Sequence, residues 1–194
     1  MLRVIGGEFR SRKLQTLNSL DTRPTLDKTR GAIFSRIGPY FENETVLDLF
    51  AGSGALGIEA VSRGAKKAVF VDKNSNAIKV INGNIETLKI QDRTEVFFLD
   101  YERYLRECTE QFDYIFLDPP YDLDAYEKAV GLITERGLLK RRGRMILESR
   151  KEKRFILDDL PVTVEKEATY GISKITYLKL TEVSNESSSI SREL

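Results

Sequence analysis

Residues 46–57 read Val46-Leu47-Asp48-Leu49-Phe50-Ala51-Gly52-Ser53-Gly54-Ala55-Leu56-Gly57, an apolar segment that leads through a glycine-rich turn into helical patterning. The glycines follow the spacing Gly-x-Gly-x-x-Gly, and Asp72 ends the next apolar run, twenty residues after Gly52. Glycines in a βα turn let the backbone approach a ligand, and an acid at the next strand end can accept hydrogen bonds from ribose hydroxyls. We therefore predict a nucleoside pocket here, in preference to a turn that merely connects a strand to a helix.

The chain beyond this loop alternates short apolar runs with amphipathic stretches, which is typical of βαβ units and a parallel sheet. Strands are expected over residues 45–49, 68–71, 95–99, 114–117 and 144–148. Helices are expected over about residues 53–63, after an N-cap at Asn74, over about 101–111 and over about 124–135. The pattern therefore predicts an α/β fold of Rossmann-like type.

The two ends of the chain depart from this alternation. Residues 162–169 and 173–181 read as two strands of a hairpin, so we expect the sheet to close with an antiparallel edge. Residues 1–44 read as a small N-terminal appendage, with short strands, a turn at Gly6-Gly7 and a helix from Thr25 to about Phe41. Residues 45–181 form the catalytic domain in this division, and the polar, serine-rich residues 182–194 are expected to be a disordered tail.

The amino-acid composition excludes several kinds of partner and catalytic site. The 194 residues are 41% apolar and 31% charged with a net charge of +1, so the whole chain carries no signal of a polyanionic partner. One cysteine, Cys108, and no histidine exclude a disulfide framework, Cys/His zinc sites and an imidazole base. We expect no metal, and chemistry from carboxylates, backbone and cofactor. Because no apolar run reaches the length of a membrane span, we also expect a cytoplasmic protein without a membrane partner.

Asp48 bears on which nucleoside is bound, because the glycine pattern alone fits a dinucleotide as well as S-adenosylmethionine. The acid lies ahead of the glycines, where its charge would meet the pyrophosphate of a dinucleotide. The sulfonium and ammonium groups of S-adenosylmethionine are cationic, so Asp48 favours that cofactor. A nicotinamide-dependent oxidoreductase remains the alternative that the glycine loop and Asp72 alone would allow.

Residues 114–121 read Tyr114-Ile115-Phe116-Leu117-Asp118-Pro119-Pro120-Tyr121, with the polar part at the carboxyl end of a parallel strand, where ligands bind in open α/β sheets. Asp118 and the Pro119 carbonyl can accept the two N–H bonds of an aromatic amine, which favours the charge its nitrogen gains on methylation. Pro120 stiffens the turn, and Tyr121 can stack on a base. The competing interpretation is a stiff strand-to-helix turn. Beside a nucleoside loop, the motif predicts methyl transfer to an exocyclic amine.

A family resemblance rests on these motifs and extends beyond them. The additional segments are Arg3-Val4-Ile5-Gly6-Gly7, Arg23-Pro24-Thr25 before a helix with Ile33-Phe34, and Gly54-Ala55-Leu56-Gly57-Ile58-Glu59-Ala60-Val61-Ser62-Arg63-Gly64-Ala65. Together they resemble the RsmD family of class I methyltransferases, which methylate guanine N2 in bacterial 16S ribosomal RNA. The resemblance covers about residues 1–180.

The resemblance implies a seven-stranded, mostly parallel sheet whose last strand is antiparallel. It implies that Asp72 holds the cofactor ribose, Asp100 the adenine amine and the backbone at Tyr101 the adenine ring, while the glycine loop supplies Phe50, Gly52 and Gly54. From its position alone, Asp100 is an acid at the carboxyl end of the third strand, which favours a ligand contact; the competing interpretation is the N-cap of the helix that follows. Adenine N6 in RNA or DNA remains an alternative target, since Asp-Pro-Pro-Tyr can hold any exocyclic amine.

Basic residues gather near the N-terminus, where residues 1–36 hold eight Lys or Arg against three acids, a local balance of +5. Such a cluster predicts contacts to the phosphates of ribosomal RNA or of the small subunit. The candidate RNA contacts are Arg3, Arg10, Arg12, Lys13, Arg23 and Arg30, with Arg150 and Lys151 at the carboxyl end of the fifth strand. The run at 140–144 lies at the amino end of that strand, and we interpret it as a solvated turn.

Overall fold

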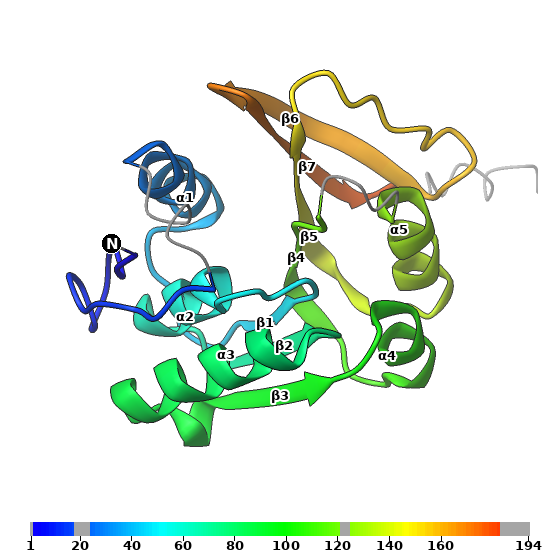
Figure 1. The fold of residues 1–194 in the computed structure, drawn as a ribbon. Coiled ribbons are helices and arrows are strands. Elements are labelled where there is room, and N and C mark those ends of the chain that lie inside the picture. The colour runs from blue at the N-terminus through cyan, green and yellow to red at the C-terminus, as the bar shows by residue number, and fades with distance from the viewer. Residues whose placement is uncertain (1, 18–23, 121–124, 183–194) are drawn as a thin grey trace, which may run out of the picture.

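The computed structural model describes residues 2–17, 24–120 and 125–182, which form one sheet flanked by helices (Figure 1). The strands are β1 (Thr45–Asp48), β2 (Lys67–Asp72), β3 (Thr94–Phe98), β4 (Phe112–Leu117), β5 (Leu139–Arg150), β6 (Val162–Tyr170) and β7 (Ser173–Leu180). The helices are α1 (Pro24–Ile37), α2 (Ala55–Ser62), α3 (Ser75–Leu88), α4 (Tyr101–Glu107) and α5 (Tyr126–Glu135), with a 3₁₀ turn, η2, at Gln91–Arg93. No helix within these ranges is long and apolar enough to span a bilayer.

The order of strands in the described part of the sheet is β3-β2-β1-β4-β5-β7-β6. Strands β1 to β5 are parallel, and the direction of winding reverses between β1 and β4, the point where open α/β sheets bind ligands. The expected seven-stranded sheet with an antiparallel last strand is confirmed. The expected antiparallel edge is confirmed as well, because the hairpin of β6 and β7 closes the sheet: β7 lies between β5 and β6 and is antiparallel to both, and β6 is the outermost strand.

The sheet separates two apolar layers, with α1, α2 and α3 on one face and α4 and α5 on the other (Figure 1). Val46, Phe116 and Ile146 point to the first face, where α1 contributes Ile33 and Phe34. Their chain neighbours, such as Leu47 and Leu117, point to the second face. Because both faces of the central strands are covered, their sequences read as continuous apolar runs rather than as alternating ones.

Several boundaries differ from those expected. Helix α2 begins at Ala55, since Gly54 before it has a left-handed φ of 78° and is its N-cap. Strand β5 begins at Leu139, so the basic run predicted as a solvated turn is part of the strand. Within it, Lys140 Nζ lies 2.7 Å from Asp113 Oδ2. The predicted N-cap at Asn74 is confirmed, because its side chain accepts the backbone N–H of Asn76 at 2.8 Å.

The N-terminal residues fold onto the main body instead of forming a separate unit. Arg3 and Lys13 pair as opposite positions of a short hairpin. The apolar residues of that hairpin, Leu2, Val4 and Leu14, are buried in the same cluster as the α2-side face of the sheet. The described part of residues 1–44 therefore lies outside the sheet but shares one hydrophobic core with it.

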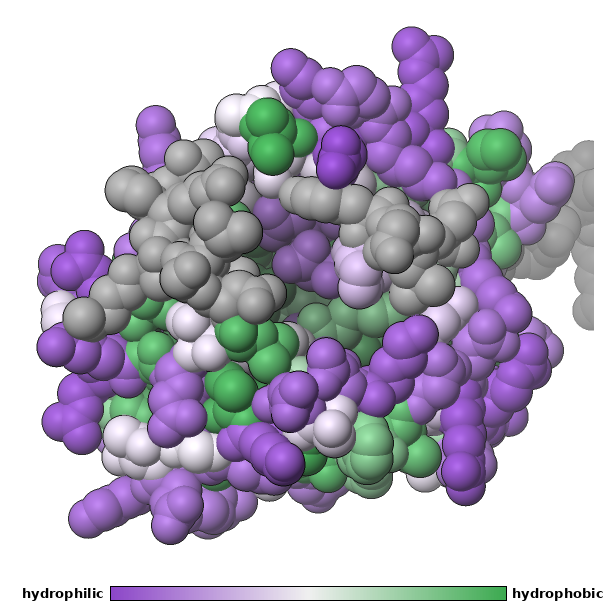
Figure 2. Space-filling model, in the orientation of Figure 1, coloured by the Kyte–Doolittle hydropathy of each residue, from purple (hydrophilic) through white to green (hydrophobic). Residues whose placement is uncertain are grey.

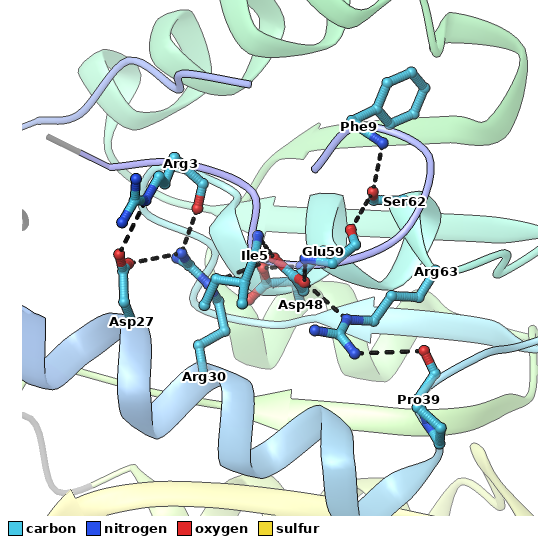
Figure 3. Close-up of polar contacts among 12 residues, drawn as sticks. Arg3, Ile5, Phe9, Asp27, Arg30, Pro39, Asp48, Glu59, Ser62 and Arg63 are labelled. Carbon is cyan, nitrogen blue, oxygen red and sulfur yellow. Dashed lines mark hydrogen bonds and ion pairs between the residues drawn. The ribbon is translucent and has the colours of Figure 1, made fainter. Parts of the chain in front are cut away.

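Glu59 joins this N-terminal segment to helix α2 (Figure 3). Its side chain is 1% exposed and accepts the backbone N–H groups of Ile5 at 2.9 Å and Gly6 at 2.8 Å. Arg63 Nε donates to it at 2.8 Å, and Arg30 Nε lies 3.7 Å away. One carboxylate thus holds the hairpin and balances arginines of α1 and of the end of α2.

Replacing Glu59 therefore tests what holds the N-terminal segment. We expect Glu59→Ala to lower the free energy of unfolding by about 3–5 kcal/mol in urea, because buried arginines and backbone donors lose their partner. The control is Glu107→Ala, since this glutamate is 59% exposed and pairs only with Arg103 on the surface. Its loss should cost about 0–1 kcal/mol. Equal effects of the two substitutions would contradict the role of Glu59.

Candidate active site

A cavity of about 810 Å³ opens at the carboxyl edge of the sheet beside the switch point, and the face drawn in Figure 2 is hollowed near its centre. Its volume suits a small-molecule ligand. The loops after β1, β2 and β4 line one side, and the N-terminal segment with α1 lines the other through Leu2, Leu17, Leu26, Arg30 and Ile33. Each of the two sequence motifs therefore contributes to a single site.

The loop after β1 is held open toward the cavity by Asp72. Gly52 has a left-handed φ of 57°, and a Cβ at this position would have no atom within 4 Å. Its N–H donates to Asp72 Oδ2 at 2.9 Å, while the N–H of Asn74 donates to Oδ1 at 2.8 Å. Each carboxylate oxygen has a second lone pair, so Asp72 can fix the loop and still accept from a ligand in the cavity that it lines.

Asp48 lies beneath this loop, 2% exposed, and contributes to the cavity wall. The N–H of Gly57 donates to its Oδ2 at 3.0 Å, and this is possible because α2 packs closely on the sheet. A Cβ at Gly57 would lie 2.4 Å from the Phe70 ring, so only glycine allows the approach. The pKa of Asp48 is raised to about 7, because burial and the nearby Asp72 charge together outweigh the Gly57 hydrogen bond, which lowers it.

An aromatic pair forms another part of the wall. The rings of Phe50 and Tyr101 lie 5.1 Å apart between centroids, and both line the cavity. Asp100 is exposed and is not among the lining residues; its Oδ1 caps α4 by accepting the N–H of Glu102 at 2.9 Å. The N-cap interpretation of Asp100 is confirmed, and its contact with an adenine amine stays a prediction. Gly54, likewise, does not line the cavity.

The motif after β4 lies beside the glycine loop at the same edge of the sheet. Asp118, Pro119 and Pro120 line the cavity, and Tyr121 is outside the described residues. Strands β1 and β4 are neighbours, so the two motifs meet although they are far apart in the chain.

Glu148, which the sequence prediction missed, also lines the cavity. It follows Leu147 at the carboxyl end of β5, and Leu147 is paired in register with Leu117. A related signal was available, because Glu148 is an acid that follows the buried run Met145-Ile146-Leu147 within β5, much as Asp72 and Asp118 follow the buried residues of β2 and β4. Burial raises the pKa of Glu148, while a hydrogen bond with the Ser173 side chain opposes that shift.

The predicted RNA contacts, Arg30 apart, fall into three groups. Arg3, Arg10, Arg12 and Lys13 are exposed on the N-terminal hairpin, and Arg150 and Lys151 are exposed beside the carboxyl end of β5. Arg23 lies outside the described residues.

Arg30 requires a correction. It is only 6% exposed, and its Nη2 donates to the Arg3 carbonyl and to Asp27 Oδ1 (Figure 3). Its guanidinium faces the cavity wall and the Glu59 cluster instead of the outer surface, so a surface phosphate contact at Arg30 is wrong. The charge count along the sequence could not distinguish a buried arginine from an exposed one.

Comparison with known proteins agrees with this geometry. Residues 2–179 match the model of a family described as "Conserved hypothetical protein 95". The chain belongs to this family, the RsmD family. Its relatives include a "Putative rRNA methyltransferase YlbH" of Bacillus subtilis, 38% identical over 92% of this chain and 98% of the relative.

A second relative in the RsmD family is "Ribosomal RNA small subunit methyltransferase D" of Haemophilus influenzae, 37% identical over 88% of this chain and 90% of its own. Among solved structures, "Putative methyltransferase yhhF from Escherichia coli" superposes with a TM-score of 0.81 at 28% identity, covering 93% of this chain and 98% of that one. The fold is the seven-stranded α/β sheet of the class I methyltransferases.

The raised pKa of Asp48 predicts how stability depends on pH. The folded protein holds a proton on Asp48 up to about pH 7, whereas the unfolded chain releases it near its ordinary value of 3.8. The contribution of Asp48 to the free energy of unfolding is therefore greatest below about pH 4 and falls by as much as about 4 kcal/mol by pH 7.

The matched variant is Asp48→Asn, which stays neutral and can still accept from Gly57. Without any cationic ligand, its stability relative to wild type should rise as the pH increases from about 4 to about 7. Urea unfolding at several pH values measures this difference, and parallel curves for the two proteins would contradict the buried, protonated state of Asp48.

Proposed function

We propose that this chain is an S-adenosylmethionine-dependent methyltransferase that acts on the exocyclic N2 amine of a guanine in small-subunit ribosomal RNA. The observation that carries the proposal is that the glycine loop with Asp72 and the Asp118-Pro119-Pro120 turn line one cavity. Relatives that share over a third of its residues are named ribosomal RNA methyltransferases, which supports this activity and substrate. We place the activity in the cytoplasm, where ribosomal RNA is found.

The residues of the cavity fit the proposed cofactor, which supplies a methyl group on a cationic sulfonium when bound. Asp48 offers a poorly solvated carboxylate whose ionised form a cation would stabilise. Asp72 has acceptor capacity for ribose hydroxyls, and the paired rings of Phe50 and Tyr101 offer an apolar surface for a purine. Asp100, which directly precedes Tyr101, would accept a hydrogen bond from the adenine amine.

Asp118 and the Pro119 carbonyl provide the acceptors for the target amine. When both N–H bonds of guanine N2 are accepted, its lone pair is drawn out of conjugation and can attack. When bound, the cofactor would supply the methyl group from its sulfonium, and the proton that the amine loses would pass to the Asp118 carboxylate or to water. Tyr121 would stack on the base, and the prolines fix the direction of the carbonyl.

In this proposal, the exposed basic residues bind the RNA. Arg3, Arg10, Arg12 and Lys13 lie on the hairpin whose Leu2 contributes to the cavity wall. Arg150 and Lys151 follow the strand that carries Glu148. Together with Arg23, they would hold phosphates on either side of a base that enters the cavity.

The activity is tested by transfer of a radiolabelled methyl group to small ribosomal subunits that lack the modification. Mass spectrometry of nuclease digests should find the label in N2-methylguanosine at one position. Label in N6-methyladenosine would replace the proposed target, and calorimetric binding of NAD instead of S-adenosylhomocysteine would overturn the proposed chemistry.

Asp72 and Asp118 should show opposite defects, because one is assigned to the cofactor and the other to the amine. We expect Asp72→Ala to weaken S-adenosylhomocysteine binding by about 1–3 kcal/mol, the scale of a lost charge-assisted hydrogen bond. Asp118→Ala should bind it almost normally but transfer methyl about a hundredfold more slowly or worse. Calorimetry and single-turnover rates measure the two effects.

The control for this pair is Asp159→Ala. The Asp159 side chain is exposed and lies outside the cavity, so its loss should change neither measurement. Normal cofactor affinity in Asp72→Ala would refute the ribose contact. Near-wild-type turnover in Asp118→Ala would refute the contact with the amine.

The hairpin should contribute to RNA affinity through phosphate contacts, which weaken with salt at a slope of about −0.7 per contact on single strands. We expect replacement of Arg10, Arg12 and Lys13 by glutamine to flatten the slope by about two units and to leave cofactor affinity unchanged. A matched triple variant at Lys140, Arg141 and Arg142 removes the same charge at the amino end of β5, away from the cavity. Equal slopes for both triple variants would place the RNA contacts elsewhere.

A further inference from the structure

Glu148 is a second carboxylate at the part of the cavity assigned to the target base. Strands β4 and β5 are parallel, with Leu117 opposite Leu147, so Asp118 and Glu148 are the next residues at the edge of the sheet. Neighbouring strands lie about 4.8 Å apart, and residues opposite each other in register point to the same face. That face is the one covered by α1, because Phe116 and Ile146, two residues before them, pack there.

The Glu148 side chain is half-buried at the wall of the cavity. It has a hydrogen bond with Ser173, which lies two residues before its pairing partner Ile175 on β7. Burial disfavours its ionised form and raises its pKa. An N–H donor from a ligand would stabilise the ionised form. The bond from Tyr126 goes to the Glu148 backbone carbonyl and leaves the side chain available to the cavity.

The hydrogen-bond donors and acceptors of each nucleobase decide which base can donate to Glu148. Guanine carries a ring N1–H directly beside its N2 amine, so an acceptor next to the amine site meets a donor. In adenine the ring nitrogen beside the N6 amine is N1, an acceptor, as is N3 beside the N4 amine of cytosine. A carboxylate next to the amine site therefore attracts guanine and repels the other two bases.

We propose that Glu148 reads the Watson–Crick edge of the target base by accepting the N1–H of guanine, and thereby selects guanine; this rests on the proposed function. Asp118 and Pro119 hold the amine and alone would accept any exocyclic amine. Glu148 is the determinant that separates guanine from adenine.

The test uses small subunits reconstituted with ribosomal RNA that carries guanine, 2-aminopurine or adenine at the modified position. 2-Aminopurine keeps the N2 amine but lacks both the N1–H and the O6 carbonyl, so the change that a Glu148 substitution makes in the ratio of single-turnover rates on guanine and 2-aminopurine isolates this contact. We expect wild type to favour guanine by about 10- to 100-fold, the effect of losing a hydrogen bond to a charged group.

The informative variant is Glu148→Gln, which has the same shape and can still bond with Ser173. Its amide offers both a donor and an acceptor, so the rate ratio should fall to within about threefold of one. Melting temperature and S-adenosylhomocysteine affinity should stay close to wild type. Glu152→Gln removes an equal charge from a side chain that is 69% exposed, and its ratio should match wild type.

Two outcomes would overturn the role of Glu148 alone: a wild-type ratio near one, or an unchanged ratio in Glu148→Gln, each with normal transfer to guanine. Transfer by wild type to the adenine subunits in place of the guanine subunits would overturn the proposed substrate together with this role. The two failures are therefore distinguishable in one set of rates.

Discussion

The hydrogen bond from Gly57 to the buried Asp48 carboxylate is the contact on which the site depends. It places a poorly solvated acid under the loop, and it exists only because α2 packs against Phe70 at a distance that no side chain at Gly57 would permit. At the same edge of the sheet, the N–H of Gly52 donates to Asp72. The close packing of α2 on Phe70 therefore fixes the buried acid that contributes to the wall of the cavity.

The opposite wall of the cavity depends on a different carboxylate. Glu59 ties Ile5 and Gly6 to α2 and lies near Arg30 of α1. Leu2, Arg30 and Ile33 line the cavity, so the residues that look like an appendage in the sequence form part of the pocket. The N-terminal segment therefore serves both the core and the site, and a division of the chain at residue 44 does not separate binding from support.

Much of the fold and of the candidate site could be predicted from local patterns in the sequence. The apolar runs predicted the five parallel strands and the hairpin, because strands covered on both faces leave a clear signal, and the residues that follow them marked Asp72 and Asp118. The position of β7 inside the sheet was not predictable, since strand order is decided by pairing between distant segments. Burial of Arg30 was missed for the same reason: its partner Glu59 lies twenty-nine residues further along the chain. Glu148 carried the same signal as Asp118 but lacked the prolines that drew attention there.

The hairpin also has a consequence for the order in which the chain can fold. Ile5 and Gly6 bond to Glu59 across 54 and 53 residues, and Gln15 bonds to Asn84 across 69. During synthesis the donors of Ile5 and Gly6 must therefore wait for α2, and the donor of Gln15 for most of α3, before they meet these acceptors. Contacts of this sequence separation make folding slow, because the loop-closure entropy is lost before the contacts form. The hairpin, although made before α2 and α3, completes its contacts only after them, and so does the cavity wall to which it contributes.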